Sequence, residues 1–165
     1  MKKIVLLVIL GVLAWWYFDG SRRMSEDQIR AYYAEEVRIM NDLDKERLCL
    51  AMSDDYRLED LSHTPQGPVR MALDKEQACT VAGAAVDMFS QLRAMSNGML
   101  APTIKHEIAR IELSPDRKSA TVESTSKVLI GERLISRGRF SEKLIRRVGK
   151  IKTLGGSSES WSYGG

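Results

Sequence analysis

The spacing of hydrophobic residues divides the 165-residue chain into three regions. An unbroken apolar run extends from Ile4 to Phe18 and offers no polar side to water, which predicts a helix in apolar surroundings. Apolar residues then recur every three or four positions in two stretches, and this period predicts amphipathic helices. Beyond Pro102 the period falls to two, which indicates β-strands.

Both amphipathic helices begin with the pattern of a capping box. Ser25 is followed three residues later by Gln28, and Asp74 is followed in the same way by Gln77. In this arrangement each end residue bonds the backbone of the other, so both stretches have a defined first turn. Polar residues near Asp44 indicate that the first helix breaks and starts again there.

Turn-forming residues punctuate the rest of the chain. A cluster of Pro and Gly residues between Leu61 and Met71 predicts a loop. The period of two beyond it predicts four strands, Ile104–Leu113, Lys118–Ile130, Arg133–Val148 and Lys150–Tyr163. Helices followed by an antiparallel meander predict an α+β domain with the helices packed on one sheet face.

The apolar N-terminal run suits a membrane anchor better than a removed signal. Lys2 and Lys3 precede it, and the bulky aromatic residues 15–18 occupy the exit, where a signal peptidase requires small side chains. Trp and Tyr rings instead favour the membrane interface. We therefore expect a single-pass anchor in residues 1–23 and a soluble domain in residues 24–165. The expected location is a bacterial inner membrane with the domain in the periplasm; the alternative is secretion after cleavage.

Three segments resemble the nuclear transport factor 2-like (NTF2-like, or cystatin-like) superfamily. They are the helix and exit over Asp44–Tyr56, the strand Ile108–Leu113, and the hairpin Arg146–Lys152, which turns over a glycine. The resemblance implies a curved antiparallel sheet wrapped around helices to form a cone. It does not imply one activity, because that fold includes isomerases, dehydratases and catalytically inert assembly modules.

Cys49 and Cys79 are the two cysteines of the chain, and each falls on the apolar side of a predicted helix. Their spacing fits neither a metal cluster nor a CxxC redox pair. Two interpretations stay open: a pair of buried thiols, or one disulfide that joins the helices in an oxidising compartment.

Two groups of acids are candidates for chemistry. Asp54 and Asp55 follow the first helical stretch and could include a general base, with Tyr32 or Tyr33 as its hydrogen-bond donor, or they could be solvated acids. Strand alternation suggests a second group, in which Glu142 and Glu159 lie near the aromatic ring of Trp161 and one acid has a raised pKa. The alternative for this group is an open sheet rim.

Basic residues repeat along the third predicted strand with a single parity. A regular strand would place them on one face; they are Arg133, Arg137, Arg139, Lys143 and Arg147. This basic face is either a solvated surface or a site for an acidic protein or an anionic membrane. The net charge of +3 and the absence of a recognition-helix motif argue against nucleic acid. No sequence motif for a phosphate, zinc or another cofactor is present, so we expect no metal or cofactor.

These features together favour a non-catalytic, membrane-anchored extracytoplasmic binding or scaffold domain that acts with a protein partner or as a homo-oligomer. The first alternative is a small NTF2-like enzyme or ligand-binding protein that uses the interior of the cone. The second resembles the inner-membrane scaffold of type IV secretion, which joins a similar domain to one helix.

Overall fold

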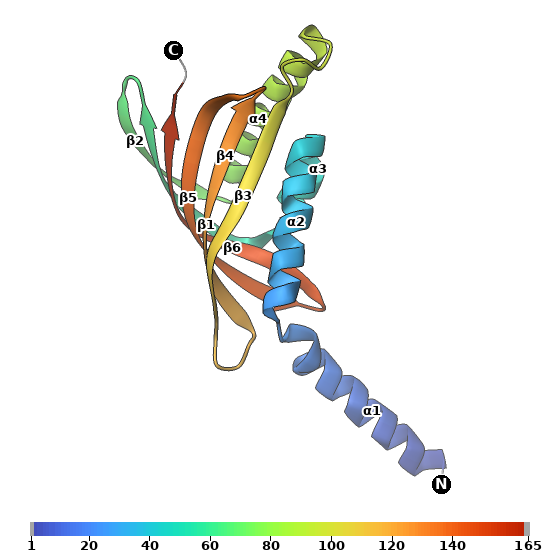
Figure 1. The fold of residues 1–165 in the computed structure, drawn as a ribbon. Helices are drawn as coiled ribbons and strands as arrows, with labels where there is room; N and C mark the ends of the chain where they lie inside the picture. The colour runs from blue at the N-terminus through green and yellow to red at the C-terminus, as the bar shows by residue number, and fades with distance from the viewer. Residues whose placement is uncertain (1, 164–165) are drawn as a thin grey trace.

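The computed structural model describes residues 2–163 of the chain. The N-terminal helix α1 (Lys2–Phe18) projects away from the other elements (Figure 1). The stretch Ile4–Arg22 has a mean hydropathy of 1.8, and only 6% of it is buried within the protein. It is therefore not a core helix, and its length and composition fit a membrane span or a signal sequence.

Both predicted capping boxes are confirmed. Ser25 and Gln28 cap α2 (Glu26–Asp42), and Asp74 and Gln77 cap α4 (Lys75–Met95). The predicted break near Asp44 is also confirmed, because Leu43 adopts a left-handed conformation and Asp44 then caps the short helix α3 (Lys45–Ala51).

The predicted loop between Leu61 and Met71 is wrong, because this region forms a hairpin. Strand β1 (Met52–Thr64) turns at residues 65–66 into strand β2 (Gly67–Asp74). Of the two prolines that suggested a loop, Pro65 lies in the turn and Pro68 lies on an edge strand, where a missing backbone N–H does not interrupt a central ladder.

The four predicted later strands are confirmed as β3 (Pro102–Leu113), β4 (Ser119–Ile130), β5 (Arg133–Arg147) and β6 (Lys150–Ser162). The six strands form one curved sheet in the order β2-β1-β6-β5-β4-β3 (Figure 1). Strands β1 and β6 are parallel, and the other neighbours are antiparallel. The described chain therefore has an α+β fold with one mixed sheet.

Helix α2 packs on one side of the sheet, which we call the inner face. Met24, Ile29 and Tyr33 contact inner-face residues of β4 and β5, and all are buried. These strand residues are Ala120, Val122 and Leu144. The contacts form the main hydrophobic core, at the end of the cone next to α1.

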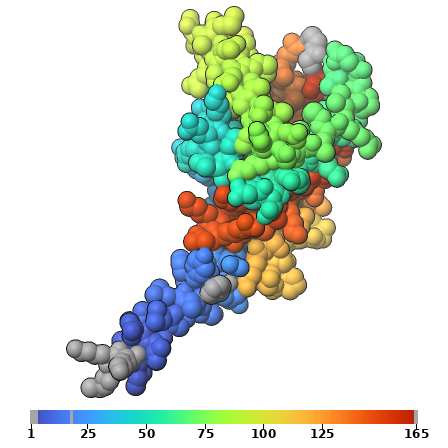
Figure 2. Space-filling model, turned by 180° about the vertical axis from the view of Figure 1, so that it is seen from behind, coloured from blue at the N-terminus to red at the C-terminus, as the bar shows by residue number. Residues whose placement is uncertain are grey.

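Packing becomes looser with distance from α1. Inner-face residues farther along the strands, such as Ser126, Ser136 and Ser160, are only half-buried. At this far end the surface is recessed between the end of α4 and β2, with β5 and β6 behind (Figure 2). The cone is thus filled near α1 and more open at the opposite end, which we call its mouth.

One edge of the sheet is covered by a side chain of α2. Ile104 in the edge strand β3 donates its backbone N–H to Asn41 Oδ1 at 2.8 Å, and the Asn41 amide donates to the Ile104 carbonyl at 3.2 Å. Asn41 thus satisfies both backbone groups of Ile104 in the way that another strand would.

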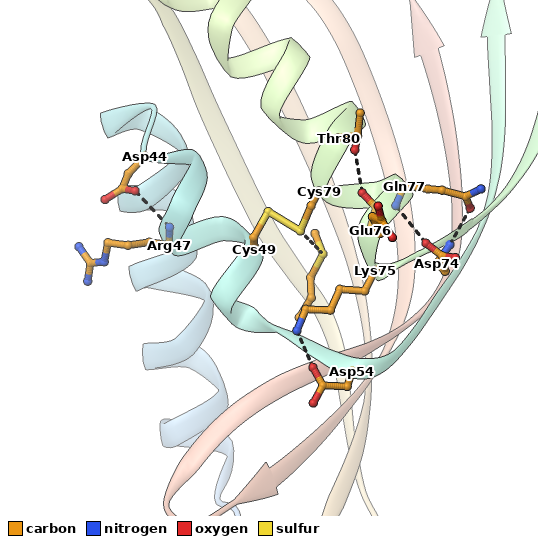
Figure 3. Close-up of a disulfide and its surroundings, with 11 residues drawn as sticks. Asp44, Arg47, Cys49, Asp54, Asp74, Lys75, Glu76, Gln77, Cys79 and Thr80 are labelled. Carbon is orange, nitrogen blue, oxygen red and sulfur yellow. Dashed lines mark hydrogen bonds and ion pairs between the residues drawn. A yellow bond between two sulfur atoms is a disulfide. The ribbon is translucent and has the colours of Figure 1, made fainter.

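A disulfide joins Cys49 in α3 to Cys79 in α4, with the two Cα atoms 5.4 Å apart (Figure 3). Of the two interpretations that the sequence leaves open, buried thiols or a disulfide, the structure shows the disulfide. The Met52 sulfur lies 3.8 Å from Cys79 Sγ, so the bond sits where α3 passes into β1.

Candidate functional site

Two glutamates from different elements face the interior of the cone. Glu142 of β5 pairs with inner-face Val122 on one side, and its Oε2 accepts a hydrogen bond from Tyr33 Oη at 2.8 Å. Glu36 lies one helical turn beyond Tyr33 on α2, and it is close enough to Glu142 for the two carboxylate charges to repel each other. Both glutamate side chains are half-buried.

The interior favours the protonated forms of these acids. Burial raises the pKa of Glu36 to about 8, and repulsion from Glu142 adds to the effect. Burial also raises the pKa of Glu142, against the opposing effect of hydrogen bonds from Tyr33 and Thr153. In the described chain no basic side chain contributes to either shift. Near neutral pH the two carboxyl groups therefore hold at least one proton between them.

Aromatic side chains surround the pair. The Tyr33 ring stacks on His106 of β3 with the centroids 4.8 Å apart, and it meets Tyr32 edge-on at 5.3 Å. Burial raises the pKa values of Tyr32 and Tyr56 and lowers that of His106, so the tyrosines and the imidazole are uncharged at neutral pH. We call these six residues the cone cluster: Tyr32, Tyr33, Glu36, Tyr56, His106 and Glu142.

Several buried polar atoms in and beside the cone cluster lack a hydrogen-bond partner within the described chain. They include Tyr32 Oη and His106 Nε2, together with the hydroxyl group of Ser124. An unpaired buried polar atom costs about 1–3 kcal/mol, so a polar molecule that bonded to these atoms would recover that energy. The interior can therefore present a protonated acid as a donor, a carboxylate as an acceptor and a neutral imidazole.

The cone cluster does not include Asp54 or Asp55. They lie at the start of β1 rather than at a helix exit, and both are exposed. Asp54 pairs with Lys75 at 2.7 Å (Figure 3), which lowers its pKa, and Asp55 pairs with Arg147 at 3.1 Å. The hypothesis of a general base at this pair therefore finds no support in the structure, because both acids are solvated and ion-paired outside the cone.

The expected grouping of Glu142 with Glu159 is wrong. Beside the hairpin turn Leu144 pairs with Thr153, which is the alternation that the sequence predicts. An extra residue in β6 then shifts the register, so that farther along the strands Phe140 pairs with Ser158 and Arg139 pairs with Glu159. The bulge contains Gly155, whose φ of 83° favours glycine. Glu159 thus lies on the opposite side of the sheet, the outer face.

On the outer face Glu159 belongs to a different set of contacts. Its Oε1 lies 3.0 Å from His63 Nε2, and the His63 ring stacks on Trp161 with the centroids 5.3 Å apart. The guanidinium carbon of Arg139 lies 5.6 Å from the centre of the Trp161 ring, a cation–π contact. Trp161 therefore lines the outer face and not the cone.

The common face expected for the basic residues of β5 is found for four of the five. Arg137, Arg139, Lys143 and Arg147 keep a common parity along β5 on the outer face. Arg133 pairs with inner-face Ile130 instead, because the register between β4 and β5 shifts by one residue next to it. Acids share the outer face with the basic residues, since Glu159 pairs with Arg139 and Glu123 pairs with Ser141. The face is therefore mixed in charge.

The outer face also carries a hollow of about 920 Å³ that crosses the sheet. Its lining includes Leu61, Thr125, Arg139 and Ser141 and none of the cone cluster. In the described part of the chain, no group of three or more His, Cys, Asp or Glu side chains is placed to hold a metal ion.

Sequence reasoning identified Glu142, and it considered Tyr32 and Tyr33 as hydrogen-bond donors, but it missed three members of the cone cluster. Glu36 borders the apolar stripe of α2, one turn after Tyr32, and this spacing is the sequence signal that could have identified it as a member of the cone cluster. His106 alternates with Ile104 and Ile108 on the inner face of β3. Tyr56 was assigned to a helix exit rather than to a strand.

Comparisons with known proteins identify the fold alone. No family model and no curated protein sequence matches this chain. A protein of unknown function with a cystatin-like fold from Nostoc punctiforme is 14% identical, with a TM-score of 0.53 over 85% of this chain and 94% of that one. An NTF2-like protein from Cytophaga hutchinsonii is 14% identical, with a TM-score of 0.52 over 84% and 99%. A putative scytalone dehydratase from Novosphingobium aromaticivorans is 11% identical, with a TM-score of 0.54 over 82% of each chain.

These similarities agree with the resemblance seen in the sequence. The chain has an NTF2-like, or cystatin-like, α+β fold, in which a curved sheet surrounds helices. The solved structures share this fold at low sequence identity, and they include proteins of unknown function as well as a putative enzyme.

Proposed function

We propose that this NTF2-like protein is a non-catalytic binding domain, held in a membrane by α1, whose cone takes up a small uncharged ligand. The observation that carries the proposal is the cone cluster. It contains two acids with raised pKa values, and unpartnered polar atoms lie within and beside it. Burial of so many polar groups without internal partners is costly for a purely structural core.

The chemistry of the cluster limits the ligand. Protonated Glu36 can donate a hydrogen bond, while Glu142 and neutral His106 can accept one. No basic side chain adds to the two glutamate pKa shifts, so an anionic ligand would meet acids without a compensating charge. Hydroxyl, phenol and amide groups on an uncharged molecule fit this set best.

The proposed location is a bacterial inner membrane, with the soluble domain in the periplasm. The apolar stretch Ile4–Arg22 and the aromatic residues near its end support an anchor. The Cys49–Cys79 disulfide supports an oxidising compartment for the domain. Cleavage of α1 as a signal is the alternative outcome, and the mass of the mature chain distinguishes the two.

Ligand binding is expected to depend on Glu142 and not on Glu159. The full chain in detergent micelles would be tested by thermal shift against small uncharged hydroxyl, phenol and amide compounds, with amines and carboxylates as comparison sets. Because a hydrogen bond to a charged group contributes about 1.5–3 kcal/mol, Glu142→Gln should weaken a stabilising compound about 10- to 100-fold.

Glu159→Gln is the matched control, since it makes the same change on the outer face. It should leave the shift of the melting temperature intact. Equal loss in both variants, or undiminished binding in Glu142→Gln, would contradict binding in the cone. A response to amines alone would contradict the uncharged class of ligand.

Acid–base catalysis is a second candidate, favoured by the pKa of Glu36 at about 8. An acid that titrates close to the working pH is suited to proton transfer, and a putative scytalone dehydratase shares the fold. If a bound compound is converted to product, the rate should fall as pH rises through about 8. Glu36→Gln should abolish turnover while it preserves binding; unchanged turnover in this variant would exclude Glu36 as the acid.

The outer face supports the partner-binding part of the proposal. Arg139 and Trp161 lie in contact beside the outer hollow, and such Arg and aromatic residues are common in protein interfaces. We propose a protein partner or a second copy of the chain there. A secretion-system scaffold is one form that this role would take.

A further inference from the structure

The end of the domain next to α1 is built from three segments bonded to one another. The β3–β4 turn is held to the start of α2, because Met24 donates its backbone N–H to the Arg117 carbonyl at 2.7 Å. The β5–β6 turn is held to the segment after α1, because Gly149 donates to the Ser21 carbonyl at 3.0 Å. Ser21 is buried, so this junction is part of the packed domain.

A side chain adds a further connection. Arg146 Nη1 donates to the Arg23 carbonyl at 2.6 Å, and its Nε donates to the Gly149 carbonyl at 3.1 Å. The segment after α1 therefore leads directly into a fixed structure. We call residues 19–23, 114–118 and 146–150 together the anchor-end surface; the two turns lie beside the start of α2 at the α1 end of the molecule (Figure 1).

Positive charge is concentrated on this surface. It contains seven basic and two acidic residues, a net charge of +5, whereas the whole chain has +3. Its basic residues are Arg22, Arg23, Arg117, Lys118, Arg146, Arg147 and Lys150. Asp19 offsets part of the charge by pairing with Arg23 at 2.7 Å and Lys118 at 2.9 Å, and Asp55 pairs with Arg147. The rest of the molecule is net acidic, so the charge is polarised toward α1.

An exposed apolar residue lies within this basic surface. Val148 at the tip of the β5–β6 turn is 58% exposed and has a φ of 48°, which a β-branched residue rarely adopts. Asparagine or glycine would relieve this backbone strain at a solvent-exposed turn. An apolar side chain between Arg147 and Gly149 instead suits the boundary between lipid headgroups and acyl chains.

The position of the surface along the chain fits such a boundary. Trp15, Trp16 and Tyr17 form the exposed end of α1, where an aromatic belt is expected at the membrane interface. The anchor-end surface begins at Asp19, immediately after them. Anionic headgroups attract basic residues at this depth, and Arg binds phosphate with parallel hydrogen bonds.

We propose that the anchor-end surface docks on the anionic phospholipid headgroups of the bilayer that α1 enters. The inference rests on the proposed anchoring by α1. It adds that the soluble domain holds one orientation relative to the membrane, and is not merely attached to it by α1. The β3–β4 and β5–β6 turns face the lipid, Val148 inserts among the headgroups, and the mouth of the cone points away from the membrane.

The test places a fluorescent probe on the full chain in lipid nanodiscs and quenches it with lipids that carry a nitroxide on the headgroup. The native cysteines form the disulfide, so a thiol probe reacts at an introduced Val148→Cys under non-reducing conditions. Lys150→Cys is a second labelling site should Val148→Cys fold poorly. Glu132→Cys, in the β4–β5 turn at the far end, is the distant control.

Quenching at Val148→Cys should be strong in discs that contain phosphatidylglycerol and weak in pure phosphatidylcholine, with little at Glu132→Cys in either. The charge reversals Arg147→Glu and Lys150→Glu should weaken the docked state by at least about fivefold each, because each basic residue contributes about 1 kcal/mol at an anionic surface and the introduced acid is also repelled. Reversal of Arg70 and Lys105, which are exposed elsewhere, should leave it unchanged. Added inorganic phosphate should not release the probe from the lipid.

Three outcomes would each contradict a different part of the proposal. A chain that does not enter the discs would contradict the proposed anchoring. A chain that enters, but shows no lipid-dependent quenching at Val148→Cys, would contradict docking and leave the anchor intact. Equal quenching at Val148→Cys and Glu132→Cys would show a domain lying flat, which also contradicts the inferred orientation.

Discussion

Glu36→Gln is expected to stabilise the protein at pH 8 by up to about 4 kcal/mol and to flatten its pH dependence. Burial raises the pKa of Glu36 from 4.5 to about 8 in the folded chain. Between these values the folded state keeps a proton that the unfolded state has released. Stability is therefore lost as pH rises from about 4.5 to about 8. Glutamine cannot ionise, so the variant avoids this loss.

Denaturant unfolding of the full chain at pH 5 and pH 8 measures the effect. Glu35→Gln is a suitable control, because Glu35 is the neighbouring residue on α2 and its pKa is lowered by hydrogen bonding to Arg38. The Glu35→Gln variant should lose stability between pH 5 and pH 8 to the same extent as the unmodified protein. An unmodified protein with equal stability at both pH values would show that the Glu36 carboxyl is not held in a charge-excluding site.

Loss of the Cys49–Cys79 disulfide is expected to cost about 3–4 kcal/mol, since the bond closes a loop with a sequence separation of 30 residues. This corresponds to a fall in melting temperature of about 10 °C. Helix α3 is only 7 residues long and has no buried residue, so its own packing contributes little to its position. Without the bond to Cys79, α3 should separate from α4 before the other elements unfold.

The double variant Cys49→Ser/Cys79→Ser and chemical reduction of the unmodified protein should give the same lower melting temperature. A conservative Thr80→Ser on the exposed side of α4 controls for substitution in this helix. An unchanged melting temperature in the double variant would mean that α3 is held by its other contacts. Hydrogen exchange at residues 45–51 would locate any loss of structure.

The sequence predicted those parts of the fold that depend on neighbouring residues. The capping boxes at Ser25 and Asp74 use residues three apart, and the hairpins beyond Pro102 join consecutive strands. Strand β1 was missed because its central partner is the last strand: Leu58 pairs with Gly156, almost a hundred residues later. Such parallel pairing leaves no local turn signal, and Pro68 suggested a loop.

The candidate site was predicted only in part for a related reason. Alternation along β5 predicts which residues share a sheet face with Glu142. Whether Glu159 lies on that face depends on the one extra residue in β6 at the bulge that contains Gly155. A single bulge reverses which side chains share a face. Glu36 resembles an ordinary solvent-facing glutamate on a helix until β5 is folded against it. Its chemistry is a property of the tertiary structure.

The bond pattern between Asn41 and Ile104 has a consequence for assembly. It occupies the β3 edge at Ile104, whereas β2, the other edge strand, has no further strand beside it among the described residues and leaves Val69 and Met71 exposed. Two chains could therefore join their sheets once, through β2 against β2, in a two-fold symmetric pair. In such a pair the β3 edges are the ones left, and at Ile104 each already has its backbone groups bonded to Asn41, which opposes growth of the sheet into a fibre.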